Sequence, residues 1–168
     1  IHPMLWGDML LHDSEGATVE GVPKLTAANA ESVEDARMRR AALPKDAIIA
    51  DWRYEPGSEQ RNGLSILQDA GFETLGSAWF QGENIIGWAQ QTIANKALGT
   101  IQTTWAGYDS SESLLYSDFK QFAAYIWAAE YAWSGGNSSP RPLGTDEGFG
   151  RGSLPYDAGT VFARSYRG

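Results

Sequence analysis

Four tryptophans stand where four strand-like runs of the sequence end. Trp6 lies in "MLWGDML", Trp52 in "AIIADWRYEPG", Trp79 in "TLGSAWFQG" and Trp105 in "TTWAGYDSS". A flat indole face suits the weakly apolar C–H surface of a pyranose ring, whose hydroxyl groups need polar partners at the rim. The chemistry that this arrangement favours is the recognition of a carbohydrate.

Polar side chains close to these tryptophans supply candidate partners for sugar hydroxyls. They are Asp8, Asp51, Arg53, Tyr54, Gln81, Asn84, Tyr108 and Asp109. Asp8 is a candidate acid or hydroxyl ligand, with the capping of a backbone amide as the alternative. The predicted substrate-binding residues are Trp6, Asp8, Trp52, Tyr54, Trp79, Asn84, Trp105 and Tyr108.

Other kinds of site find little support in the sequence. The two histidines, His2 and His12, are isolated from one another and no HExxH spacing occurs. The chain has no cysteine, which excludes thiolate chemistry, and no glycine-rich phosphate loop of the P-loop or Rossmann type. We therefore expect no metal, no cofactor and no catalytic residue of these kinds.

The elements that must position the tryptophans follow an alternating pattern typical of βα units with parallel strands. Strands are expected at about 3–11, 47–52, 72–80 and 98–105, and helices at about 31–43, 58–70, 84–96 and 117–134. Loops gather at the carboxyl ends of parallel strands, where ligands bind. The four tryptophans are therefore expected to converge there.

Several local expectations complete this outline. Asn29 is a candidate cap for the first helix, and the basic run "RMRR" (37–40) is expected on a solvated helix face. Trp88, Trp127 and Trp133 lie in helical runs and are expected in the core. Residues 1–136 form one domain in this interpretation, and residues 137–168, rich in Gly, Pro and Ser, form an irregular tail.

The composition limits the partners. The formal net charge of -8 over 168 residues argues against a nucleic-acid partner, because no basic stripe is present to neutralise phosphates. No apolar run approaches the roughly 18 residues that a membrane span requires, so no membrane partner is expected.

Taken in order, "LWGDML", "IIADWRYEP", "TLGSAWFQGENIIGWA" and "LGTIQTTWAGY" resemble the second half of the catalytic barrel of the family 20 glycoside hydrolases, the β-N-acetylhexosaminidases. The resemblance covers about residues 3–134. It implies an α/β fold in which a parallel (βα)4 half-barrel corresponds to strands five to eight of a (β/α)8 TIM barrel. It also implies that Trp6, Trp52 and Trp105 form the aromatic walls around the terminal sugar, with Trp79, Phe80 and Asn84 near its acetamido group.

The resemblance also implies what the chain lacks. Family members use the acetamido oxygen of the substrate as nucleophile, assisted by an Asp–Glu pair after strand four, and no adjacent Asp–Glu precedes the first strand here. Many members carry a glutamate two residues after the last strand's tryptophan, where this chain has Gly107. The expected protein is a hexosaminidase fragment that is inactive alone.

Two alternatives remain open at this level. The chain could be a sugar-binding module that never had a catalytic half, or a structural half-barrel whose tryptophans fill the core. In each case four parallel strands leave two free edges and an apolar face. A homodimer through these half-barrel edges is therefore expected.

Overall fold

The computed structural model describes residues 2–15, 27–57, 62–105 and 119–135. These form an α/β structure with one four-stranded parallel sheet and four α-helices. The strands are β1 (Met4–Trp6), β2 (Ile48–Trp52), β3 (Glu73–Ala78) and β4 (Gly99–Gln102). The helices are α1 (Val33–Ala42), α2 (Gly63–Asp69), α3 (Gly82–Ala94) and α5 (Phe119–Ser134), and two short 3-10 helices are η1 (Asp8–Leu10) and η2 (Asp13–Glu15).

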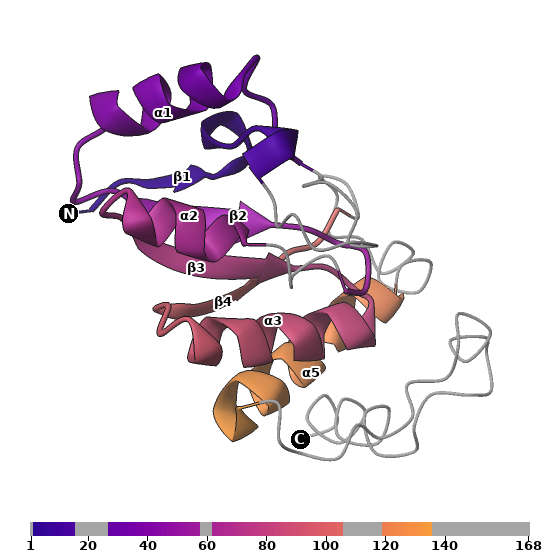
Figure 1. Ribbon diagram of the computed structural model, residues 1–168. Helices are drawn as coiled ribbons and strands as arrows, with labels where there is room; N and C mark the ends of the chain where they lie inside the picture. Colours follow the sequence, from indigo (N-terminus) through magenta and orange to yellow (C-terminus); the bar gives the residue numbers. More distant parts are fainter. Residues whose placement is uncertain (1, 16–26, 58–61, 106–118, 136–168) are drawn as a thin grey trace.

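The strands lie side by side in chain order, β1-β2-β3-β4, from the top of the sheet to the bottom in Figure 1. All three neighbouring pairs are parallel, and the register pairs Trp6 with Ala50 and Trp52 with Ser77. Because the strands run the same way, their carboxyl ends meet at one end of the sheet. The sequence correctly predicted the four strands and their alternation with helices.

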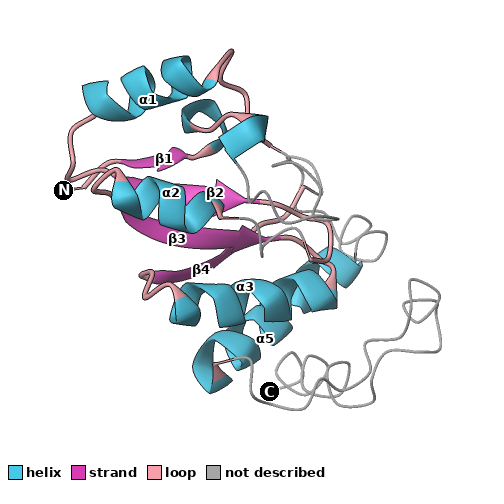
Figure 2. Ribbon diagram, in the orientation of Figure 1, coloured by secondary structure: helices cyan, strands magenta, loops and turns pink. Residues whose placement is uncertain are grey.

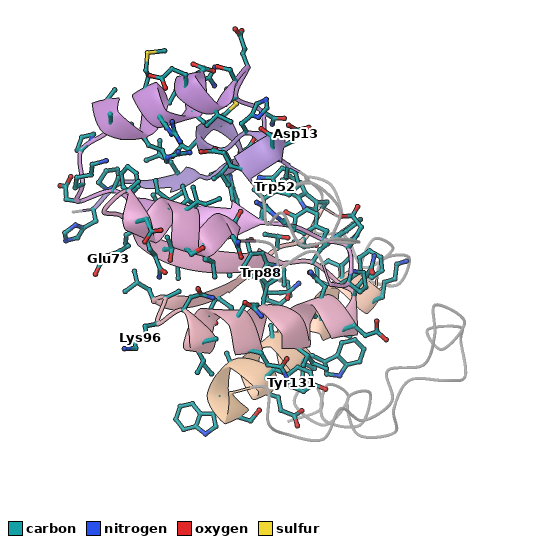
Figure 3. All side chains as sticks on the ribbon, in the orientation of Figure 1. Asp13, Trp52, Glu73, Trp88, Lys96 and Tyr131 are labelled. Atoms are coloured by element: carbon teal, nitrogen blue, oxygen red, sulfur yellow. The ribbon has the colours of Figure 1, made fainter. Side chains whose placement is uncertain are left out.

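One face of the sheet packs against α2 and α3; in Figure 2, α2 lies in front of the strands and α3 lies below β4. Ile49 of β2 packs with Leu67 of α2 in one apolar cluster. On β3, Gly76 lets Trp88 approach the strand closely, since a Cβ on Gly76 would lie only 2.9 Å from Trp88 Cζ3. Trp88 is fully buried and lies between β3 and α3 in Figure 3.

Two apolar clusters make up the core of the described residues. The first joins α2 and β3 to α3 and α5 and consists of Leu64, Ala78, Ile85, Trp88, Ala89, Ala124, Trp127 and Tyr131. The second lies between β2, η1 and α2 and consists of Leu10, Leu11, Ala47, Ile49, Leu67 and Phe72. The prediction that Trp88 and Trp127 are core residues is confirmed. Trp133 was wrongly placed there, because it is 95% exposed near the end of α5.

The other face of the sheet retains accessible apolar side chains. Met4 and Trp6 of β1 are exposed, and Ile48, Leu75 and Ile101 on the neighbouring strands are only partly buried. These residues share a face of the sheet, because every second residue of a strand points to the same side. The register pairs Met4 with Ile48. Leu75 lies two residues before Ser77, which pairs with Ile101. The described part of the chain therefore does not bury this face fully.

The beginning of the chain differs from its prediction in two ways. The strand expected at 3–11 ends at Trp6, because the chain turns at Gly7, whose carbonyl accepts a hydrogen bond from Leu10 N at 2.9 Å as η1 begins. The first helix is capped by Ser32, whose hydroxyl accepts from Asp35 N at 3.0 Å, and not by Asn29.

The basic run 37–40 is only partly a solvated face. Arg40 is buried, and its guanidinium forms two hydrogen bonds with the Glu15 carboxylate, at 2.6 and 3.0 Å, and one with the Leu10 carbonyl at 2.6 Å. The partner carboxylate offsets part of the cost of burying the charge, and it belongs to a segment distant in the sequence. The local sequence pattern around the basic run therefore did not indicate this ion pair.

Three further points concern the predicted outline. Gly71, with φ of +92°, follows the end of α2 in the left-handed conformation that glycine favours after a helix. Residues 58–61, at the predicted start of that helix, and the predicted tail at 137–168 lie outside the described residues. None of the helices within the described ranges is long and apolar enough to cross a membrane.

Candidate functional site

A cavity of about 410 Å³ opens at the carboxyl ends of the strands. The described residues that line it are Trp6, Asp8, Trp52, Tyr54, Trp79 and Trp105. Figure 3 places Trp52 at this end of β2, whereas Glu73 marks the opposite end of the sheet. A cavity of this size falls in the range of roughly 300–1,000 Å³ that small-molecule sites occupy.

The sheet positions the four indoles. Trp6 and Trp52 are the last residues of β1 and β2, Trp79 directly follows β3, and Trp105 lies shortly after β4. Parallel strands in register bring residues at equivalent positions together, so the predicted convergence of the four tryptophans is observed. Their binding of a sugar stays a prediction.

Tyr54 lies at the centre of this group of rings. Its ring centroid is 5.0 Å from that of Trp52, 5.6 Å from that of Trp79 and 6.5 Å from that of Trp105, with tilted planes in each case. Contacts at these distances are favourable for aromatic pairs. Tyr54 therefore links three walls of the cavity into one packed unit.

The Tyr54 hydroxyl is held by two protein groups. Trp105 Nε1 donates to it at 3.1 Å, and the Thr103 hydroxyl lies 3.3 Å away. Thr103 Oγ1 donates its single proton to the Ala78 carbonyl at 2.8 Å, so the Tyr54 hydroxyl is the donor in its pair with Thr103. Thr103 thus fixes the orientation of both the tyrosine and, through it, Trp105.

Gln121 of α5 holds two of the tryptophans from behind. Its side-chain Oε1 accepts from Trp79 Nε1 at 2.7 Å, from the backbone N of Trp105 at 2.7 Å and from Thr104 Oγ1 at 3.2 Å. Gln121 is buried, and two of its three donors are N–H groups with no acceptor capacity, which fixes the orientation of its amide. Helix α5 therefore sets the position of two cavity walls.

Asp8 is the acidic group of the lining. Its Oδ2 accepts from Asn29 Nδ2 at 2.8 Å, and its backbone carbonyl accepts from Asn29 N at 2.7 Å. Asn29, which the sequence suggested as a helix cap, instead orients this carboxylate. Because an ionised carboxylate has about four acceptor positions, Asp8 keeps capacity for a ligand.

Asp51 and Arg53 were predicted at the rim, but both are buried on the helix side of β2. Arg53 Nη1 donates to Asp51 Oδ1 at 2.8 Å, and the two side chains are almost fully inaccessible. Burial raises the pKa of Asp51 to about 6, an effect that Arg53 opposes and the charge of Asp8 reinforces. This pair lies under the site and takes no part in its lining.

Gly63, the first residue of α2, lies directly against this ion pair. A Cβ at this position would clash with Asp51 Oδ2 and would lie 2.7 Å from Arg53 Nη2. The close approach explains why a glycine starts the helix. It also encloses Asp51 and contributes to the desolvation of its carboxylate.

One predicted site residue of the described structure, Asn84, lies away from the cavity lining. Asn84 is fully buried, and its Nδ2 donates to the backbone carbonyl of Arg53 at 2.9 Å, which Trp88 Nε1 also contacts at 3.0 Å. Its observed role is to hold the loop after β2, on which Tyr54 lies. Tyr108, like Asp109, lies outside the described residues.

Sequence reasoning missed Gln121, Thr103 and Asn29. Gln121 and Thr103 touch cavity residues through single side-chain atoms, and Asn29 supports Asp8 from 21 positions away. Gln121 carried little local signal, because it precedes the apolar run "FAAYIWAAEYAW" and follows the polar residues Asp118 and Lys120.

The described residues hold no group of three or more His, Cys, Asp or Glu side chains that could bind a metal ion. Their arrangement offers five aromatic rings and one carboxylate around an open cavity. Comparison with known proteins adds no assignment, since no protein-family model and no curated protein sequence matches the chain.

Proposed function

We propose that the cavity lined by Trp6, Trp52, Trp79 and Trp105 binds a terminal sugar, and that the chain is half of a glycoside hydrolase barrel resembling family 20. The sugar class is a β-linked N-acetylhexosamine or a related sugar. The observation that carries the proposal is the convergence of four strand-end indoles on one cavity of about 410 Å³ with a carboxylate at its edge.

The chemistry of the lining supports a carbohydrate. Trp6 is 42% and Trp105 61% exposed, so both keep ring surface that a ligand can cover. A pyranose packs its C–H face on such a surface, and Asp8 accepts hydrogen bonds from its hydroxyl or amide groups. Rigid aromatic walls bind at low entropic cost, and here Tyr54 and Gln121 already fix two of them.

The arrangement of the sheet supports a half-barrel. In a (β/α)8 barrel, consecutive strands are neighbours and parallel, helices cover the outside, and one face of every strand lines a closed interior. The order β1-β2-β3-β4 has this connectivity, and α2 and α3 contact one face. Met4, Ile48 and Ile101 would belong to the interior that a second half completes.

The chain alone is proposed to bind without hydrolysing. In the family that it resembles, protonation of the leaving oxygen and orientation of the acetamido nucleophile need an Asp–Glu pair after strand four. Among the described residues, Asp8 is the carboxylate that lines the cavity, and no glutamate lies beside it there. The loss of general-acid catalysis alone removes roughly 10²–10⁴-fold in rate.

The open edges of β1 and β4 support a second part of the proposal, that the isolated chain forms a homodimer. Each is a terminal strand of the described sheet, and exposed Met4 and Trp6 lie on β1. A two-fold axis would let each copy cover the other's apolar face with an identical surface. A non-catalytic binding module remains the alternative to an enzyme fragment.

Calorimetric titration with N-acetylglucosamine tests sugar binding. We expect saturable binding that weakens about tenfold in Trp105→Ala, since loss of one stacking partner costs on the order of 1.4 kcal/mol. Trp133→Ala is the matched control, because Trp133 is 95% exposed on α5 and does not line the cavity. Equal loss of affinity in both variants, or no binding by the parent chain, would refute the proposal.

A further inference from the structure

The polar atoms of the aromatic walls are largely occupied by the protein itself. Trp79 Nε1 donates to Gln121 at 2.7 Å and Trp105 Nε1 donates to Tyr54 at 3.1 Å. The Tyr54 hydroxyl accepts from Trp105 and donates to Thr103, so its proton is used as well. These three walls therefore present ring faces to a ligand, and not hydrogen-bonding groups.

Among the described residues of the lining, the charged group is the carboxylate of Asp8. Asn29 holds Asp8 Oδ2 at 2.8 Å, which orients the carboxylate without neutralising its charge. Among the described residues that line the cavity, none has a cationic side chain. Aromatic faces carry negative electrostatic potential, so the rings and the carboxylate attract the same sign of ligand charge.

We propose that the preferred ligand of this cavity is cationic, a hexosamine whose amino group is free and protonated. The inference rests on the proposed sugar site, but its ligand differs from the N-acetylated sugars of the resembled family, because a free amine lacks the acetamido oxygen that those enzymes use as nucleophile. The sugar ring packs on an indole, and its ammonium group lies over neighbouring rings within reach of Asp8. The N-acetylated sugar is the weaker ligand, because acetylation removes the charge.

Energetic considerations favour this choice over a neutral sugar. An ammonium over an aromatic face gains about 0.5–1 kcal/mol at exposed sites and about 2 when desolvated, and several rings act together here. A neutral acetamido group needs both a donor and an acceptor. Three of the five ring donors of the lining, those of Trp79, Tyr54 and Trp105, already bond to protein groups, which leaves fewer donors for an acetamido carbonyl.

The test compares three probes on the full chain by calorimetry at pH 6 and constant ionic strength: glucosamine, N-acetylglucosamine and tetramethylammonium. We expect glucosamine to bind roughly tenfold more tightly than N-acetylglucosamine, and tetramethylammonium to compete with both. In Asp8→Asn the preference for glucosamine over N-acetylglucosamine should fall to roughly threefold or less. The aromatic rings are still present in this variant, but the carboxylate is lost.

Asp46→Asn is the matched control for the loss of one negative charge. Asp46 is exposed and precedes β2, so it lies at the end of the sheet opposite to Trp52. This variant should keep the full preference for glucosamine. A preference that falls equally in both variants would show that the overall charge of -8 attracts the cation, and would overturn the inference.

The outcomes separate this inference from the sugar site on which it rests. Equal binding of the two sugars, or tighter binding of N-acetylglucosamine, would overturn the cation preference and leave the sugar site standing. Binding of tetramethylammonium without either sugar would overturn the sugar site and the amino-sugar identity of the ligand. Absence of binding by all three probes would overturn both. These comparisons use the unaltered chain and do not depend on whether a variant folds.

Discussion

Gln121 Oε1 lies 2.7 Å from Trp79 Nε1 and 2.7 Å from the backbone N of Trp105. One atom of helix α5 thereby holds two cavity walls that follow different strands. Partly buried N–H donors that lose their acceptor destabilise the fold, so the position of the two indoles depends on this glutamine. The walls of the aromatic cavity are consequently positioned by helix α5 as well as by the strands of the sheet.

Gln121→Leu should destabilise the fold and weaken ligand binding together. The substitution keeps a similar volume but leaves Trp79 Nε1 and Trp105 N without their acceptor, at a cost of about 1–3 kcal/mol in unfolding free energy. Urea denaturation followed by circular dichroism measures the change. Glu130→Leu, at an exposed position of the same helix, is the control and should change stability by less than about 0.5 kcal/mol. Equal stability of the Gln121 variant and the parent chain would contradict the proposed role.

Gly63→Ala should destabilise the protein, contrary to the usual effect in a helix. Alanine ordinarily favours a helix over glycine by about 1 kcal/mol. Here the added Cβ would clash with Asp51 Oδ2 and approach Arg53 Nη2 to 2.7 Å, so we expect a net loss of about 1–3 kcal/mol. Thermal unfolding measures it, and Asp69→Ala, at an exposed position of α2, is the control. A gain in stability for Gly63→Ala would show that the ion pair does not abut the helix.

The buried carboxyl of Asp51 should make stability depend on pH. Burial raises its pKa from 3.8 to about 6, with Asp8 adding to the effect and Arg53 opposing it, so the folded chain holds a proton that the unfolded chain has lost between these values. The contribution of Asp51 to stability therefore decreases as pH rises from about 4 to about 6.

Asp51→Asn removes this titration, although it also breaks the ion pair with Arg53 at every pH. Relative to the parent chain, the variant should gain up to about 3 kcal/mol as the pH rises from 4 to 7. Urea denaturation at pH 4, 5, 6 and 7 measures the difference. Asp46→Asn controls for the loss of an exposed negative charge. A difference between Asp51→Asn and the parent that is independent of pH would contradict the raised pKa.

The isolated chain should be a dimer at micromolar concentration. The exposed β1 residues Met4 and Trp6 and the partly buried Ile48 and Ile101 form a face that water solvates poorly. Burial between two copies should exceed roughly 2,000 Å² if each completes the other's barrel. Sedimentation equilibrium measures the mass, and Met4→Lys should shift the population towards monomer. A cooperatively folding monomer would contradict this prediction.

The sequence predicted the repeated features of the fold better than its individual long-range contacts. The apolar run 47–52 and the tryptophans at strand ends are local signals, and they gave β2 and the convergence of Trp6, Trp52, Trp79 and Trp105. Parallel pairing then forces residues at equivalent positions to meet, so a pattern along the chain becomes an arrangement in space.

The errors concern polar residues whose partners are distant in sequence. Arg40 was expected in solvent because its partner Glu15 lies 25 positions away, and Asn84 was expected in the cavity although it bonds to the backbone of Arg53. Asp51 shows the same limit. Its place one residue before Trp52 suggested the rim, but alternation along a strand directs neighbours to opposite faces.

The most direct test of the central claim is a nuclear magnetic resonance titration of the seven tryptophan indole N–H groups with an amino sugar. We predict that the signals of Trp6, Trp52, Trp79 and Trp105 shift in a saturable way. Those of the core residues Trp88 and Trp127 and of exposed Trp133 should stay in place. Shifts confined to the latter three, or no shift at saturating sugar, would contradict a sugar site at the carboxyl ends of the strands.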